Sequence, residues 1–418
     1  MLETQAWSQH ASINHMSDQS VVTEAFYARF LSYFTSEGDG KDIRNRVSWL
    51  HRLPQLSVDG TNEALTLAVQ ATASSYCAVQ TSNPALARHA RDLYGRAIQT
   101  QGRFLARSRT GKVAVTVHMI STSVLFSFFE AIQATNADAY RAHIYGAAKM
   151  FEVTHPNQCT EGVLCQIFFH IRTQMAFVQL TSHGKETPVD VKKILYDALI
   201  YEELPIFQRL VTHFTILASM YSGVDGHDKQ PRLEEAKAMS ISTAIEELWS
   251  EYELTAALDN EQLTWHNTIT NTAHYRDAFT ALVCSYFSAT RILLSTLSPI
   301  PATPESDTAK LHQSILDVAN YLQTHVIGCA YMRIAGPLLL VALHAPRTKQ
   351  RKKAFEYFQS WEYTGLRGIT TLIIDCMYRH RGLRAPLERE PTSHDGEGSS
   401  AVEGEQAVAR ASRQRLRS

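Results

Sequence analysis

Apolar residues recur at every third or fourth position over most of this chain, and the spacing is most regular between Ala85 and Pro156. Such spacing places apolar side chains on one face of an α-helix, so the stretch predicts three consecutive amphipathic helices. The first follows Asn83-Pro84, a capping residue and a proline suited to the first helical position. The second is expected to begin near Lys112 and, being apolar on most sides, to be buried in the middle of the fold. The three apolar stripes are Leu86, Ala90, Leu93, Ala97 and Phe104; Val113, Val117, Ile120, Val124 and Phe128; and Tyr140, Ile144, Ala147 and Phe151.

The same spacing continues toward the C-terminus and favours helices over strands. Strand-like alternation does not persist anywhere, and the Asn-Gly signal of a tight hairpin is absent. We therefore predict an all-α fold, a single large helical-bundle or superhelical domain of about a dozen or more helices with disordered termini. Further helices are expected over residues 21–33, 62–77, 163–180, 204–221, 233–252, 269–297 and 309–326, and the final ordered part over 331–378.

Composition divides the chain into three parts. Residues 1–20 are polar and lack the apolar core of a secretory signal, so they predict a flexible N-terminal tail. Residues 21–383 predict one all-α domain. Residues 384–418 are rich first in Glu, Ser and Gly and then in Arg, which predicts a disordered tail with a basic end.

Charge and cysteine usage exclude several classes of protein. The chain has 40 Lys and Arg against 41 Asp and Glu, a balance that argues against most of the surface contacting DNA and leaves open a local basic patch. Its six cysteines lack the close pairs of a zinc site, so we expect buried, reduced thiols of an intracellular protein. No run reaches the length of a membrane-spanning helix, and we expect a soluble protein without a membrane partner.

The motifs of common enzymes do not occur. The sequence lacks HExxH, GxSxG, a Gly-rich phosphate loop and GxGxxG. It also lacks the Asp-Asp pair that would hold magnesium beside a diphosphate. His170 lies on an apolar helix, where a hydrogen-bonded core histidine is expected rather than a ligand. We therefore predict no catalytic residue, no cofactor and no metal ligand, and a protein that is not an enzyme.

Two basic segments are the remaining candidates for binding. The first segment has five cations in seven residues and allows two interpretations. It is either a nuclear-import signal or a patch for acidic partners, or it is a solvated turn before the next helix. Its cations are Arg347, Lys349, Arg351, Lys352 and Lys353. The C-terminal end is similar, since it would bind an importin or a nucleic-acid backbone non-specifically, or serve as a solubilising tail. Its arginines are Arg413, Arg415 and Arg417.

The order of segments then becomes informative. Tyr94-Gly95-Arg-Ala97 on the first helix is followed by Phe129-Glu130 at the end of the second and by Tyr140-Arg-Ala-His143-Ile-Tyr-Gly146-Ala147 on the third. An apolar helix with Phe168, Phe169 and Arg172 comes next. In order and spacing, residues 60–380 resemble the regulatory domain of fungal zinc-cluster transcription factors, the fungal-specific transcription factor domain. Tyr140 stands where that family usually has Trp.

This resemblance implies a nuclear transcriptional regulator or co-regulator, in the setting of a fungal secondary-metabolite gene cluster. It implies helical contacts with DNA-binding or other transcription proteins, a homodimer, and the sensing of a small molecule. The family's zinc cluster of six cysteines is missing, since the first cysteine is the isolated Cys77, and we do not expect sequence-specific DNA binding by this chain. An alternative is that the cluster is encoded upstream of the first codon.

The matching residues are interpreted as packing residues: Tyr94, Gly95, Tyr140, His143, Gly146 and Ala147. Gly146 and Ala147 are expected to let a neighbouring helix approach closely, and His143, one turn earlier, to bond across that contact. Two other functions remain open from the residues alone. One is an all-α metabolic enzyme of isoprenoid or secondary metabolism without a recognisable metal motif, and the other is a helical scaffold.

Overall fold

The computed structural model describes eleven stretches of the chain: residues 24–31, 49–58, 62–110, 114–135, 137–153, 162–182, 204–222, 233–269, 272–298, 305–325 and 328–380. All of them belong to one compact unit, Met1–Gly382. The predicted tails, 1–20 and 384–418, and the basic residues Arg413, Arg415 and Arg417 lie outside the described residues.

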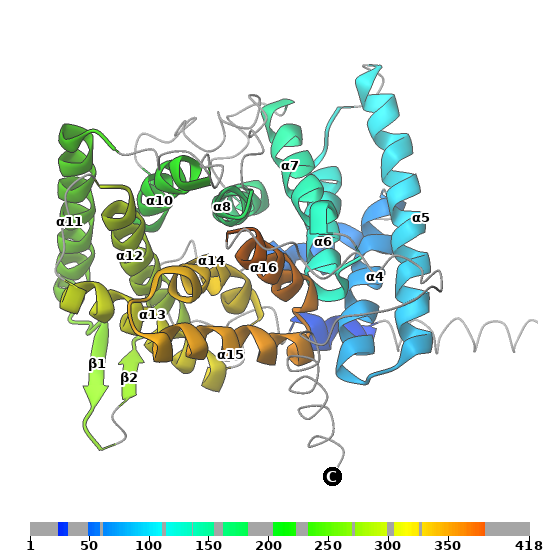
Figure 1. Cartoon of the computed structure of the whole chain (residues 1–418). Coiled ribbons are helices and arrows are strands. Elements are labelled where there is room, and N and C mark those ends of the chain that lie inside the picture. The colour runs from blue at the N-terminus through cyan, green and yellow to red at the C-terminus, as the bar shows by residue number, and fades with distance from the viewer. Residues whose placement is uncertain are drawn as a thin grey trace, which may run out of the picture. The chain divides into compact units, whose positions relative to one another are not determined.

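The fold of this unit is all-α, which confirms the predicted fold class (Figure 1). Apart from one small hairpin, every regular element among the described residues is a helix. A helix also covers residues 24–31. The elements are η1 Trp49–Arg52, α3 Leu53–Val58, α4 Glu63–Gln80, α5 Pro84–Arg109, α6 Val117–Gln133, α7 Ala137–Val153, α8 Gly162–Leu180, α10 Ile206–Ser222, α11 Glu235–Leu258, β1 Thr264–Asn267, β2 Thr272–Tyr275, α12 Ala278–Leu297, α13 Glu305–His325, α14 Gly328–His344, α15 Thr348–Thr364 and α16 Arg367–His380.

Side-chain caps fix where several helices begin. The Asn83 side chain accepts hydrogen bonds from the backbone N–H groups of Ala85 and Leu86, at 3.0 and 3.1 Å, and Pro84 occupies the first helical position of α5. These contacts satisfy N–H groups that have no partner within the helix. Thr116 caps α6 in the same way, so α6 begins at Val117 and later than the predicted start near Lys112.

A β-hairpin replaces the start of the helix predicted over 269–297. β1 and β2 pair antiparallel, with Thr264 opposite Tyr275 and His266 opposite Ala273. The side chain of Asn267 accepts a hydrogen bond from the Ile269 N–H at 2.9 Å, which supports the turn. Helix α12 then begins at Ala278. The prediction is wrong for residues 269 and 272–277, because the strands, four residues each, are too short to show an alternating pattern.

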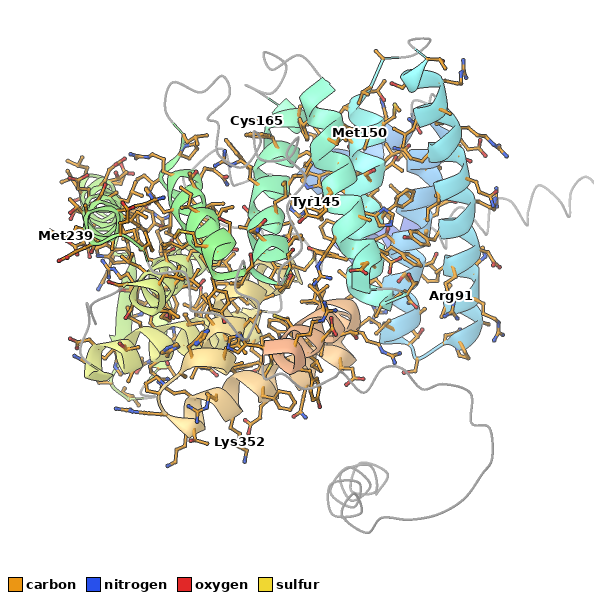
Figure 2. The ribbon with its side chains drawn as sticks, turned by 45° about the horizontal axis from the view of Figure 1, so that its top comes forward. Arg91, Tyr145, Met150, Cys165, Met239 and Lys352 are labelled. Carbon is orange, nitrogen blue, oxygen red and sulfur yellow. The ribbon has the colours of Figure 1, made fainter. Side chains whose placement is uncertain are left out.

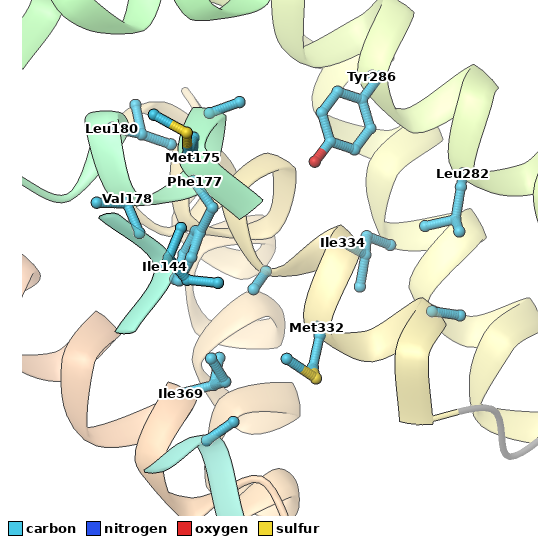
Figure 3. Close-up of a cluster of buried hydrophobic side chains, with 14 of the residues drawn as sticks. Ile144, Met175, Phe177, Val178, Leu180, Leu282, Tyr286, Met332, Ile334 and Ile369 are labelled. Carbon is cyan, nitrogen blue, oxygen red and sulfur yellow. The ribbon is translucent and has the colours of Figure 1, made fainter. Parts of the chain in front are cut away.

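The core joins the early and late helices of the unit. α6 is buried on almost all sides, as its composition predicts. Figure 3 shows apolar side chains from α7, α8, α12, α14 and α16 meeting in one cluster. One helix, α12, is long and apolar enough to cross a membrane by length and composition, but 83 % of its most apolar window is buried inside the protein. We interpret α12 as a core helix, since its neighbours already cover it. The cluster in Figure 3 contains Ile144, Met175, Phe177, Val178, Leu180, Leu282, Tyr286, Met332, Ile334 and Ile369.

Two glycines bring the last helix onto the centre of the fold. Gly365 ends α15 with a left-handed backbone conformation, φ +99°, that glycine adopts without steric cost. Gly368, in the first turn of α16, lies so close to α6 that an added Cβ would be 1.9 Å from the Glu130 carbonyl oxygen. Only glycine fits at this crossing, so α16 packs on α6 through backbone contact.

Candidate functional site

Three segments of the sequence motif meet in a buried polar cluster. Tyr94 of α5 donates its hydroxyl hydrogen to Glu130 Oε1 of α6 at 2.7 Å, and its oxygen lies 2.7 Å from His143 Nε2 of α7. Because that hydrogen is directed at Glu130, His143 must donate from Nε2 to the hydroxyl oxygen. Thr135 adds its backbone N–H at 3.0 Å and its hydroxyl at 2.5 Å to the Glu130 carboxylate. The cluster therefore ties α5, α6 and α7 together.

Aromatic rings enclose this cluster. The Tyr94 ring stacks on Phe129 with centroids 4.0 Å apart and meets Phe126 edge-on at 5.3 Å, while His143 lies 5.2 Å from Phe126. Burial lowers the pKa of His143 to about 4 and raises the pKa of Tyr94. Both groups are therefore neutral near neutral pH, and their hydrogen bonds stabilise the helix contacts.

The other motif residues occupy different environments. Tyr140 is buried and donates to Gln174 Oε1 of α8 at 2.6 Å, and Ala147 is fully buried. Among the described residues, an added Cβ at Gly146 or at Gly95 would have no heavy atom within 4 Å. The prediction that Gly146 permits close helix approach is therefore wrong for this part of the chain, because none of its elements comes near enough to need glycine there. The close approach occurs at Gly368, which the sequence analysis did not single out.

The basic cluster before Phe355 forms the first turns of α15. Arg351 donates from Nη1 to the carbonyl oxygens of Ala345 and Pro346, so it caps the C-terminal end of α14. Lys353 pairs with Glu356 at 3.6 Å and lies 5.0 Å from the centroid of the Tyr357 ring. The remaining three cations are exposed, and Figure 2 shows Lys352 projecting from the ribbon. They are Arg347, Lys349 and Lys352.

A second polar cluster lies where α10, α14 and α16 meet. The Tyr221 hydroxyl oxygen is 2.7 Å from His344 Nε2 and 3.3 Å from His380 Nδ1. Burial, together with nearby His380 and His312, lowers the pKa of His344 to about 3. His312 of α13 is itself fully buried, and neither of its ring nitrogens has a hydrogen-bond partner among the described residues. Within those residues, no group of three or more His, Cys, Asp or Glu side chains is arranged to hold a metal ion.

A pocket of about 700 Å³ opens between the hairpin and helices α11, α12 and α13. Thr264, His266, Ala273 and Tyr275 share one face of the hairpin by register and line it. Because two of these residues, Thr264 and Ala273, are small, the hairpin does not fill the space above the helices.

The helical walls of this pocket are aromatic and charged. Trp249 of α11 and Phe287 of α12 meet edge-on with centroids 4.9 Å apart. Arg291 reaches the pocket from α12, and in the described part of the chain its guanidinium group forms no hydrogen bond or ion pair. Burial raises the pKa of Asp317 on α13, which accepts a hydrogen bond from Gln313 at 2.9 Å. The sequence did not reveal this pocket, because the apolar spacing predicted a helix across part of the hairpin.

Comparisons with protein-family models, with curated proteins and with solved structures find no match to this chain.

Proposed function

We propose that this chain is a transcriptional regulator or co-regulator of the kind formed by the regulatory domains of fungal zinc-cluster transcription factors. One observation carries the proposal. The first and third segments of the motif contribute Tyr94 and His143, and the segment between them contributes Glu130. These three side chains form one buried hydrogen-bonded cluster. The motif is therefore a packing unit of the all-α domain. Such a unit supports helical protein contacts in the nucleus, with a DNA-binding protein or a second copy as partner.

Ligand sensing is the second part of the proposal and rests on the hairpin pocket. Its aromatic walls suit a planar apolar molecule, and the unpaired Arg291 suits an acidic group on that molecule. A ligand held there contacts the hairpin and three helices together, so binding would favour one position of the hairpin. Secondary metabolism as the setting is an expectation from the resemblance alone.

A tethering experiment tests the proposal. The full chain is fused to a heterologous DNA-binding domain in a fungal host, and a reporter gene downstream of the cognate site is measured. We expect the reporter to rise or fall relative to the DNA-binding domain alone. A fusion that is folded and nuclear but leaves the reporter unchanged contradicts the proposal. That result would favour the alternative, an all-α metabolic enzyme.

The ligand-sensing part has its own variant. Arg291→Gln removes the unpaired cation from the pocket without changing a described hydrogen bond, and Arg367→Gln, an exposed position on α16, is a control with the same charge change outside the pocket. We expect Arg291→Gln to alter reporter output and Arg367→Gln to leave it as in the wild type. If both variants and the wild type give the same reporter output, the proposal that the pocket senses a ligand is contradicted.

A further inference from the structure

The outer face of α5 concentrates positive charge in a chain whose total charge is close to zero. α5 contains six arginines, no lysine and one acid, Asp92. Five of the arginines have exposed side chains, and in the part of the chain that the structure describes none of their guanidinium groups forms a hydrogen bond or ion pair. We call these five the arginine stripe: Arg88, Arg91, Arg96, Arg103 and Arg107.

Neighbouring helices do not neutralise the stripe. α5 packs mainly against α4 and α6, which together contain two acids, the exposed Glu63 and the buried Glu130. It also contacts α7 through Tyr94, and the acid in the first turn of α7, Asp138, pairs with Arg141. Asp92 makes no ion pair with Arg88 or Arg96, although both are one turn away. In Figure 1 α5 lies at the margin of the labelled helices, and Figure 2 shows nitrogen-tipped side chains projecting from its outer side. No described neighbour covers the stripe, which is therefore open to a partner on this part of the structure.

Helix geometry places three members of the stripe in one row and Arg91 on the opposite side of the outer face. At 100° per residue, Arg96, Arg103 and Arg107 fall within about 40° of one another, and Arg91 lies roughly 120–160° away around the axis. The stripe extends for about 28 Å along the axis. The surface between Arg91 and the row, which we call the crest, carries one arginine and one acid near its N-terminal end, followed by small or neutral residues. They are Arg88 and Asp92, and then Gly95, Gln99, Gly102 and Ala106.

Within the part of the chain that the structure describes, the glycines of the crest make no packing contact. An added Cβ at Gly95 or Gly102 would meet no heavy atom within 4 Å there, so this packing does not require glycine at either position. Glycine inside a helix costs about 1 kcal/mol relative to alanine. The small residues of the crest, flanked by arginines, instead let a negatively charged partner approach the helix backbone.

We propose that the arginine stripe binds the phosphate backbone of a DNA duplex without reading its sequence. An arginine fork pairs with phosphate oxygens in a bidentate manner, and Arg91 is set apart from the row of three by the width of a helix, about 10–12 Å. That width is close to the roughly 12 Å between the phosphate strands that border the major groove. On the proposed function, this contact would hold the regulator beside the DNA on which its partner acts.

The surface suits a nucleic acid better than a protein. Protein interfaces have an apolar, often aromatic centre, whereas DNA interfaces are polar and strongly positive. Ile98 is the one large hydrophobic residue on α5 that the structure shows as exposed. A second copy of this chain docking through the same face would set arginines against arginines, so this stripe does not form the homodimer contact.

Binding of the full chain to a fluorescein-labelled duplex of about 24 base pairs tests the proposal by anisotropy between roughly 50 and 200 mM salt. If five arginines displace counterions, log affinity falls with log salt at a slope of about −4.5, which is a loss of roughly 500-fold over that range. Removing three of them should change the slope to about −1.8. The variant is Arg96→Gln/Arg103→Gln/Arg107→Gln.

Two charge-matched variants localise the effect. One removes the exposed cations of α15, and the other removes arginines from the C-terminal end, so each loses three charges like the α5 variant. We expect both to keep a salt slope within about one unit of the wild-type slope. They are Arg347→Gln/Lys349→Gln/Lys352→Gln and Arg413→Gln/Arg415→Gln/Arg417→Gln.

Three results would overturn the assignment. The first is a wild-type slope near zero, and the second is an α5 variant that binds no more weakly than either matched variant. The third is stripe-dependent binding of a labelled Glu-rich peptide with no binding of the duplex, which would assign the stripe to an acidic protein. Circular dichroism of each variant confirms that the exposed substitutions leave the fold intact.

Discussion

Gly368→Ala is the substitution whose effect follows most directly from the coordinates. The added Cβ would lie 1.9 Å from the Glu130 carbonyl oxygen and 2.9 Å from that of Ala131. Both oxygens belong to the backbone of α6, so no side-chain rotation relieves the contact. Bringing the nearer contact to 3.0 Å, the lower limit for real Cβ atoms, requires α16 and α6 to separate by about 1 Å.

The expected cost exceeds the gain in helix propensity. Overpacking a close contact costs about 1–3 kcal/mol and occasionally more, and the backbone clash places this site at the upper end. Alanine gains at most about 1 kcal/mol over glycine in a helix. We therefore expect Gly368→Ala to lower the free energy of unfolding by about 2 kcal/mol or more.

Urea unfolding followed by circular dichroism measures this loss, with Gly102→Ala as the matched control. Gly102 is exposed in the middle of α5, where an added Cβ meets nothing within 4 Å, so this variant should gain about 0.5–1 kcal/mol. If Gly368→Ala unfolds at the same urea concentration as the wild type or a higher one, the close crossing of α16 and α6 is refuted.

The remaining predictions concern the buried polar groups. His143→Ala should lower the melting temperature, at a cost of about 1–3 kcal/mol, because the Tyr94 hydroxyl loses a partner; an unchanged melting temperature would count against the packing role. Tyr94→Phe should cost a similar amount, since Glu130 and His143 both lose a bond to the hydroxyl, and a neutral effect in urea unfolding would contradict the cluster. His312→Leu should raise stability near neutral pH by about 1 kcal/mol, because it removes two unsatisfied buried nitrogens, and a lower unfolding midpoint would oppose this. The folded-state pKa is about 4 for His143 and His312 and about 3 for His344, which is below the value of 6.5 in the unfolded chain. Because the unfolded chain then binds more protons, the free energy of unfolding should fall as pH drops from about 6.5 toward 4. A urea midpoint that stays constant over that range would contradict the burial of these rings.

Local signals predicted the helices well. The Asn83-Pro84 start of α5 depends on residues within one turn of each other, and the side-chain cap forms where the sequence places it. The apolar character of α6 likewise predicted its burial on almost all sides. Such features need no knowledge of the rest of the chain.

Features that depend on contacts between segments far apart in the sequence could not be predicted from local signals. The hairpin is held by Arg276, which pairs with Glu261, and by the Tyr321 hydroxyl, which donates to the Tyr275 carbonyl oxygen at 3.3 Å. Gly146 and Gly368 both lie within helices, and only the position of a neighbouring backbone shows that a close crossing occurs at Gly368. The pocket beside the hairpin and the residues that line it could be recognised only once these long-range contacts were known.

Transcript profiling of a gene-deletion strain and of the same strain with the gene restored tests the regulatory role most directly. The account predicts that a defined group of genes changes expression on deletion and returns to its original level on restoration. If no group of genes changes in the deletion strain under conditions in which the protein is present in the wild type, the regulatory role is contradicted.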